Sequence, residues 1–382
     1  MLAWRADCAR QFRERGVMFP YLLRARPARA AVTAVAALAA LSASAAVLAH
    51  PAAAATAAPA SVTWTRLTLL HGWRNSPDRT SVAEVALVSG IVQLKGAIST
   101  AASNPVPFVL PPQFRPATIV EVSAALHGAA KGVLVFDPSG AVTVFAEQSF
   151  SAAKSFTSLD GVSFARSASS FTALTLQNGW HRFAGDRQPA LRLISGIVHF
   201  EGTMHQTAGG NPVAFTLPPG FRPAKTVFVK VDLCYANNGR LQIKPDGVVT
   251  VEAEGGTFSH AQCYTSLDGA SFARSRASFK ALKLQNGWTN APYSTSNAEV
   301  RLISGIVHFK GAISTKGSNP VAFTLPPGVR PATNVFVPVD LCSANYGQLR
   351  IQRNGVVTVQ AEGGNFSQAQ CFTSLDGVSF AR

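Results

Sequence analysis

Histidine and carboxylate side chains are the groups in this chain whose types and positions could do chemistry. His199 and His308 each lie in the pentapeptide GIVHF, and Gln93 occupies the same position of an earlier copy. Polar and apolar residues alternate there, which puts this position on one face of a strand. We therefore interpret both histidines as structural.

Aspartate recurs in the tetrapeptide SLDG, at Asp160, Asp268 and Asp376. An Asp beside Gly is primarily turn chemistry, because its carboxylate can bond its own backbone and Gly can take a positive φ. A ligand contact is the alternative. No HExxH, GxSxG, phosphate-binding loop or dinucleotide fingerprint occurs. The sequence thus predicts no catalytic residue, metal or cofactor, and a protein that is not an enzyme.

Four of the five cysteines form two pairs at equivalent places, 29 positions apart: Cys234 with Cys263, and Cys342 with Cys371. A first copy has Ala125 and Ser155 at what we align as the matching positions. Two cysteines that are bonded to each other are expected to be absent together from such a copy. Zinc would need four ligands per site, and disulfides are the default in exported proteins. We predict two disulfides within repeats.

These residues belong to a repeat of domain size. Gly-Trp, SGIV, NPV, Leu-Pro-Pro and SLDG each occur three times, and successive SLDG copies begin 108 positions apart, at Ser158, Ser266 and Ser374. A unit of this length can bury its own core. The sequence predicts three domains: 61–166 without a disulfide, 167–274 and 275–382.

Within a copy the hydrophobic period is two, as in FKALKL and VAFTL. Asp-Gly in LQIKPDGVVTV and Asn-Gly in LRIQRNGVVTV are hairpin signals. We expect an all-β fold, with seven or eight short strands per domain in a small sandwich or barrel, and no helix.

The N-terminus has a basic region, the apolar run 30–49 and small residues, an order typical of a secretory signal peptide. We predict a signal peptide over 1–55 and a linker over 56–60, with Met1 or Met18 as the start. A retained membrane anchor is the alternative. The expected location is secreted, extracellular or associated with the cell wall, with no stable membrane insertion after cleavage.

Aromatic and amide residues are the candidate ligand contacts. Predicted loops carry Tyr235, Asn237, Asn238, Tyr293 and Tyr346. The tryptophans of the Gly-Trp motif, Trp73, Trp180 and Trp288, could stack on sugars, but their recurrence beside Gly favours the core. Trp180 and Trp288 are kept as tentative ligand contacts.

The charge of the chain is +15; without the predicted signal peptide, which holds seven Arg and two acidic residues, it is about +10 and is spread along strands and turns. No basic stripe with interleaved aromatics occurs, so nucleic acid is not an expected partner. The positive charge of the chain is more consistent with extracellular glycan or an anionic cell-envelope polymer as the partner.

Taken together, Gly-Trp, SGIV, FTLPPGFRP, GVVTV and SLDGVSF resemble the head modules of bacteriophage tail-fibre and receptor-binding proteins. The resemblance implies compact β-barrels, trimeric assembly and recognition of surface saccharide. This chain departs from it by its export signal and by three tandem copies with disulfides, which suggests an intramolecular pseudo-trimer. We predict a secreted, multivalent binding protein; the alternatives are a structural surface protein without a ligand and a glycan-active enzyme.

Overall fold

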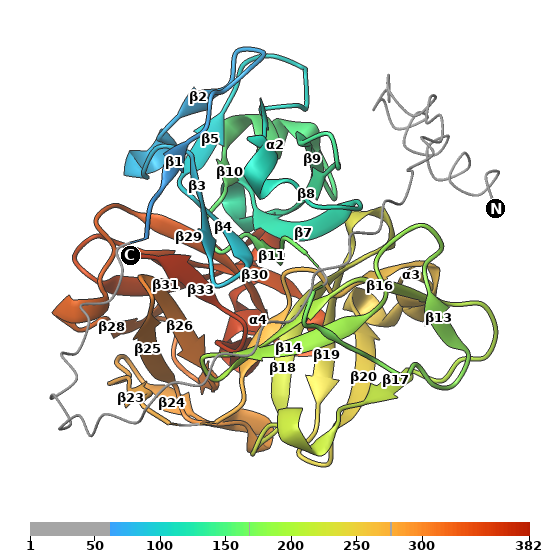
Figure 1. Cartoon of the computed structure of the whole chain (residues 1–382). Coiled ribbons are helices and arrows are strands. Elements are labelled where there is room, and N and C mark those ends of the chain that lie inside the picture. Colours follow the sequence, from blue (N-terminus) through green and yellow to red (C-terminus); the bar gives the residue numbers. More distant parts are fainter. Residues whose placement is uncertain (1–61, 168, 276) are drawn as a thin grey trace, which may run out of the picture. The chain divides into compact units, whose positions relative to one another are not determined.

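The computed structural model describes residues 62–167, 169–275 and 277–382. The predicted signal peptide and linker lie outside the described residues. Antiparallel strands dominate (Figure 1), so the all-β prediction is confirmed. Among the described residues no helix is long and apolar enough to cross a membrane.

Each sequence repeat contributes a four-stranded sheet that carries the SGIV hairpin. In the first repeat its order is β1 (Thr65–Arg66), β3 (Glu84–Val88), β4 (Ile91–Lys95) and β11 (Ser163–Ala165). In the second it is β12 (Thr172–Ala173), β14 (Ala190–Ile194), β15 (Ile197–Glu201) and β22 (Ser271–Ala273). In the third it is β23 (Lys280–Ala281), β25 (Glu299–Ile303), β26 (Ile306–Lys310) and β33 (Ser379–Ala381).

The remaining strands pack opposite this sheet. The first repeat has β10 (Thr157–Ser158), β5 (Ala97–Ser99) and β2 (Arg74–Asn75), and separately β6 (Phe108–Val109), β9 (Ala141–Ala146), β8 (Lys131–Phe136) and β7 (Val120–Ala125). The third has β24 (Trp288–Asn290), β27 (Ala312–Thr315) and β32 (Thr373–Ser374), and β28 (Val321–Thr324), β31 (Val356–Ala361), β30 (Tyr346–Ile351) and β29 (Val335–Asp340). In the second these join as β13 (Trp180–Arg182), β16 (Thr203–Gln206), β21 (Thr265–Ser266), β18 (Val227–Leu233), β19 (Asn238–Ile243), β20 (Val248–Ala253) and β17 (Val213–Thr216).

The expectation of no helix is wrong. A six-residue helix precedes SLDG in each repeat: α2 (Phe150–Ser155), α3 (Phe258–Cys263) and α4 (Phe366–Cys371). Each spans fewer than two turns, too short to display a 3.6-residue period in the sequence. In the first, the Ser149 side chain caps the helix by accepting from the backbone N–H of Ser151.

Three large hydrophobic clusters form the core, and each contains residues of one sequence repeat only. They extend from Leu67 to Phe164, from Leu174 to Phe272 and from Leu282 to Phe380. Each large apolar side chain buried in this way contributes about 1.5 to 3 kcal/mol.

The SLDG aspartates hold the repeat together from inside. Oδ1 of Asp160 accepts a 2.9 Å hydrogen bond from the backbone N–H of Gly96, and Asp268 and Asp376 make the same bond to Gly202 and Gly311. A Cβ at Gly96 would lie 2.4 Å from the Val82 carbonyl oxygen, so that position requires glycine. All three aspartates are buried. The carboxylate thus bonds a distant strand rather than its own turn, and it faces no solvent ligand.

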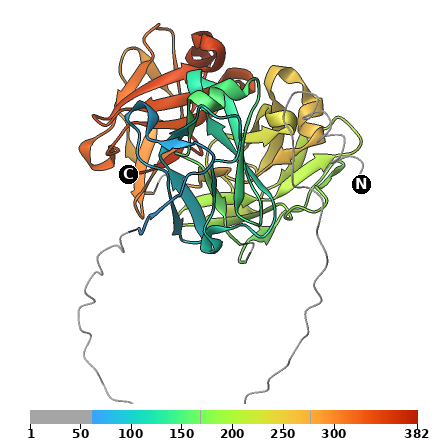
Figure 2. The ribbon, with the colours of Figure 1, turned by 90° about the horizontal axis from the view of Figure 1, so that it is seen from above.

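The three repeats lie next to one another when seen from above (Figure 2), and hydrogen bonds link them in a cycle. The hydroxyl of Ser158 donates to the Phe336 carbonyl, that of Ser374 to Phe228 and that of Ser266 to Glu121, over 2.6, 2.6 and 2.9 Å. The first repeat therefore bonds the third, the third the second, and the second the first. Strands β7, β18 and β29 contact one another where the repeats meet.

Both cysteine pairs are joined: Cys234–Cys263 with Cα atoms 5.7 Å apart and Cys342–Cys371 with 5.6 Å. They fit an oxidising environment outside the cytoplasm. Each first cysteine begins a 3-10 helix, η5 (Cys234–Ala236) or η9 (Cys342–Ala344), and η3 (His127–Ala129) takes that place in the first repeat. The counterpart of the first cysteine is therefore His127, two residues beyond Ala125; the alignment missed it because this segment shares few letters with the other copies.

Candidate functional site

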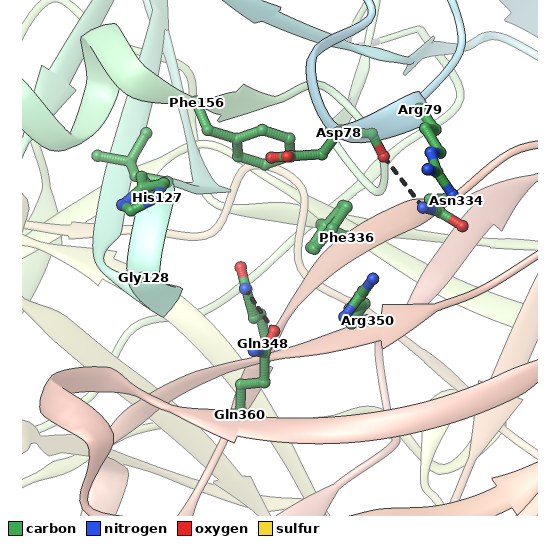
Figure 3. A pocket seen from close by; sticks show the side chains of 11 residues that line it. Asp78, Arg79, His127, Gly128, Phe156, Asn334, Phe336, Gln348, Arg350 and Gln360 are labelled. Carbon is green, nitrogen blue, oxygen red and sulfur yellow. Dashed lines mark hydrogen bonds between the residues drawn. The ribbon is translucent and has the colours of Figure 1, made fainter.

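A cavity of about 540 Å³ lies between the first and third repeats (Figure 3). We call it the open cleft. The first repeat lines it with the turn η1 (Pro77–Arg79), the start of η3 and Phe156, and the third with Asn334 and strands β29, β30 and β31. Its lining side chains are Asp78, Arg79, Leu126, His127, Phe156, Asn334, Phe336, Gln348, Arg350 and Gln360, with Gly128 beside them.

Two phenylalanines form the apolar part of the open cleft. The rings of Phe156 and Phe336 meet edge to face with centroids 4.8 Å apart, and both side chains are largely buried. The Arg350 guanidinium lies 6.0 Å from the Phe336 ring centroid. The Phe336 position is fixed by the bond from Ser158 to its carbonyl. This contact between repeats is consequently a fixed apolar wall.

Amide and guanidinium groups form the polar part. Gln348 donates from Nε2 to Oε1 of Gln360 over 2.9 Å, while its own Oε1 has no hydrogen-bond partner although the residue is only 3% exposed. The Nε of Arg350 is likewise buried without a partner. Buried polar atoms are normally hydrogen-bonded. The lining of the open cleft therefore contains one buried acceptor and one buried donor whose hydrogen-bonding capacity is unused.

The turn at the rim is anchored across the repeats. The side-chain amide of Asn334 donates to the Asp78 carbonyl over 3.0 Å, and its backbone N–H to the Arg79 carbonyl over 3.2 Å. Ser76, Asp78 and Arg79 all have φ between 54° and 63°. Such left-handed residues persist only where the surroundings determine them. The Asp78 and Arg79 side chains are thus presented on a fixed, exposed turn.

His127 stands in the open cleft at the position that a disulfide occupies in the other repeats. His127 is exposed. The residue that corresponds to the second cysteine of the other repeats is Ser155, at the end of α2, and its hydroxyl donates to the Ser151 carbonyl over 3.0 Å. The lining set contains no Ser, Thr or Cys that His127 could activate.

The equivalent place between the third and second repeats is filled; we call it the closed cleft. Tyr293 takes the position of Asp78, and its ring lies 5.7 Å from that of Phe372. Arg240 takes the position of Gln348 and donates to Glu252 over 2.7 Å and to Asp340 over 3.1 Å. Its guanidinium lies 4.6 Å from the Phe228 ring. Ion pairs and aromatic packing thereby occupy the volume that is open in the other cleft.

The structure brings few of the sequence-predicted contacts together. Tyr293 is 62% exposed, on the rim of the closed cleft. Tyr235 is half-buried in η5, and the Asn237 side chain donates to the Cys234 carbonyl over 2.8 Å. None of these residues lines the open cleft.

The loop placement of Asn238 and Tyr346 is wrong. They begin strands β19 and β30, are fully buried, and donate to the carbonyls of Ala344 and Ala124. A strand whose polar residues face a neighbouring repeat has a sequence that resembles that of a loop. Both side chains serve contacts between repeats.

The tryptophans are core residues. Trp73, Trp180 and Trp288 are at most 5% exposed, and their indole N–H groups donate to the carbonyls of Asn104, Asn211 and Asn319 over 3.0, 3.1 and 3.0 Å. The NPV motif thus supplies the indole's partner. The tentative ligand role of Trp180 and Trp288 is wrong, because no face is open to solvent.

A second recurring carboxylate escaped the sequence comparison. Glu147, Glu254 and Glu362 come from equivalent positions, and one carboxylate oxygen of each lies within 4.8 Å of the others. Burial raises the pKa of Glu147 to about 8 and that of Glu254 to about 7, helped by the neighbouring carboxylates. The backbone N–H of Lys131 donates to Glu362 over 3.0 Å. We call this group the glutamate cluster; it is partly protonated at neutral pH.

The residues of the open cleft were missed because they come from two repeats and differ from their counterparts. The divergent turn after the Gly-Trp motif was the available signal. No protein-family model, curated protein or solved structure matches the chain.

Proposed function

We propose that the protein is a secreted binding protein for glycan or cell-envelope polymer, and that the open cleft is its principal site. The observation that carries the proposal is the partnerless Gln348 Oε1 beside an apolar wall and the Arg350 guanidinium. The cavity volume is in the range of ligand sites, which combine apolar walls with a few polar groups.

Saccharide chemistry matches this lining. A pyranose has hydroxyls that both donate and accept hydrogen bonds, and an apolar face for the small part of Phe336 that remains exposed. Gln348 offers an acceptor, and Arg350 offers donors that also suit a carboxylate or phosphate of an anionic polymer. Asp78 on the rim can accept from hydroxyls. The positive charge of the chain would favour approach to an anionic polymer.

The three repeats, in this proposal, form an intramolecular pseudo-trimer with unequal clefts. The cyclic bonds from Ser158, Ser374 and Ser266 support it. The difference between the open and closed clefts means that these two interfaces are unequal as binding sites. Scattering from an extended string of separated domains would contradict the pseudo-trimer.

A glycan array probed with the full chain tests the function. We expect binding that Arg350→Ala and Gln348→Ala abolish while the fold is retained. The matched control is Gln242→Ala, at the position of Arg350 in the closed cleft, which should bind as the unmodified chain does. Absence of any binding would favour a structural surface protein, for which the disulfides and contacts between repeats suffice.

A further inference from the structure

A second cavity, of about 30 Å³, lies where the SGIV hairpins of all three repeats meet. We call it the axial cavity. Each repeat lines it with the same four positions of its hairpin: 88, 89, 91 and 93; 194, 195, 197 and 199; and 303, 304, 306 and 308. A space of this size holds one or two water molecules or a single ion.

The lining is built in layers, because every second residue of a strand faces the same side. Ile91, Ile197 and Ile306 form an apolar layer beside the hairpin turns. Gln93, His199 and His308 form the next layer, two positions further along β4, β15 and β26. The polar layer is thus set below an apolar one.

The charged layer beyond it is already paired. Lys95 bonds Glu84 over 2.8 Å, Arg187 bonds Glu201 over 3.0 Å, and Lys310 lies 3.8 Å from Glu299. These groups do not satisfy the polar layer.

The side chains of Gln93, His199 and His308 are 6%, 9% and 8% exposed. Within the described part of the chain none of the three side chains forms a hydrogen bond. Three polar side chains that are more than nine-tenths buried line one small cavity, so a water molecule or an ion held in it can serve as their common partner.

His199 and His308 each bring an imidazole to the axial cavity from β15 and β26, and Gln93 brings an amide from β4. A neutral imidazole offers a ring nitrogen to a metal, and the amide oxygen of Gln93 is a third donor.

We propose that the axial cavity binds one divalent first-row transition-metal ion of the zinc class through His199, His308 and Gln93. One ligand comes from each repeat, so the ion would join all three. A water molecule would complete a tetrahedral set.

Two cations stand near the site. Arg192 and Arg301 lie opposite His199 and His308 across the hairpins, and Arg301 reaches the carbonyls of Ser195 and Ala277, each over 3.4 Å. They oppose a cation and would favour an anion. The ion is therefore expected to bind more weakly than in a four-ligand structural zinc site.

Titration of the full chain with Co²⁺ and Zn²⁺, followed by Co²⁺ absorption and calorimetry, tests the proposal. We expect one equivalent of metal ion to bind, and the bound Co²⁺ to show the absorption spectrum of a tetrahedral ion with nitrogen ligands. His199→Gln with His308→Gln should lose this binding and keep the fold, because Gln93 shows that the position accepts glutamine. Gln93→His should tighten it.

His181, which is exposed, and His205, which is half-buried, have ring centroids 6.3 Å apart, lie outside the axial cavity and provide the matched control. His181→Gln with His205→Gln should leave the bound equivalent unchanged. Arg192→Ala with Arg301→Ala should tighten the metal. Binding that survives loss of His199 and His308, no bound equivalent, or weaker metal binding after loss of the two arginines would each overturn the proposal.

Discussion

The open and closed clefts share one frame and differ in a few side chains. In both, a serine of SLDG donates to a phenylalanine carbonyl of the neighbouring repeat, and an aromatic residue packs edge to face on that phenylalanine. The closed cleft adds Tyr293, the Arg240 ion pairs and the Cys342–Cys371 disulfide. The open cleft has Asp78, Gln348 and His127 instead. Substitutions within a fixed frame therefore convert a packed contact into a cavity with unused hydrogen-bonding capacity.

The largest expected effect comes from the disulfide. Replacing Cys342 and Cys371 by serine should lower the free energy of unfolding by roughly 3 to 4 kcal/mol, because a loop of about 30 residues regains its entropy. Thermal unfolding of the double variant and of the unmodified chain, both without reductant, measures the difference in stability. The open cleft should keep its ligand affinity. If the double variant also bound the ligand of the open cleft more weakly, the two clefts would not be independent.

The ion pairs of the closed cleft come next. Asp340→Ala should cost about 2 to 3 kcal/mol, since Arg240 keeps only Glu252 while its surroundings stay buried. Glu84→Ala, which breaks the more exposed pair with Lys95, is the control and should cost at most about 1 kcal/mol. Denaturant unfolding of both variants gives the values. Similar costs would contradict the importance of the closed-cleft network.

Asp78→Tyr should convert the open cleft toward the closed one. Tyr293 adopts φ 54° at the equivalent position, the φ of Asp78 itself, so the backbone accepts the change. We expect loss of ligand binding with a stability change below about 1 kcal/mol. Isothermal titration and thermal unfolding measure the two quantities. Unchanged affinity would place the ligand elsewhere.

The smallest effect concerns the glutamate cluster, which all three repeats share. Its raised pKa values mean that the folded chain binds more protons than the unfolded chain between about pH 4.5 and 8. Stability from this source is therefore greatest at low pH and is lost as the pH rises through 7 to 8.

Replacing Glu147, Glu254 and Glu362 by glutamine should flatten this part of the pH dependence, measured as the midpoint of thermal unfolding from pH 5 to 9. The buried SLDG aspartates, whose pKa values burial raises to about 7, contribute in the same direction and remain in the variant. An unchanged profile would contradict the role of the cluster.

Local signals in the sequence predicted much of the fold. Alternation and the Asp-Gly and Asn-Gly turns gave the strands, and the shared loss of two positions gave the cysteine pairs. The helix before SLDG was missed because six residues carry no period. The partner of Asp160, Gly96, also could not be identified, since the two motifs meet only after folding.

The site was less predictable, because it joins residues that are far apart in the chain. Gln348 and His127 meet only when the third repeat packs on the first. Asn238 and Tyr346 looked like loop residues because their buried partners belong to another repeat. The stretch after the Gly-Trp motif, which differs between the copies, contains Asp78, but nothing in the sequence connects it to the strand side chains opposite.

The most direct test is a binding titration of the best array ligand against the full chain, Arg350→Ala and Gln242→Ala. We predict that Arg350→Ala abolishes binding while Gln242→Ala leaves the affinity unchanged. Binding retained by Arg350→Ala and lost by Gln242→Ala would contradict the assignment of the open cleft as the principal site.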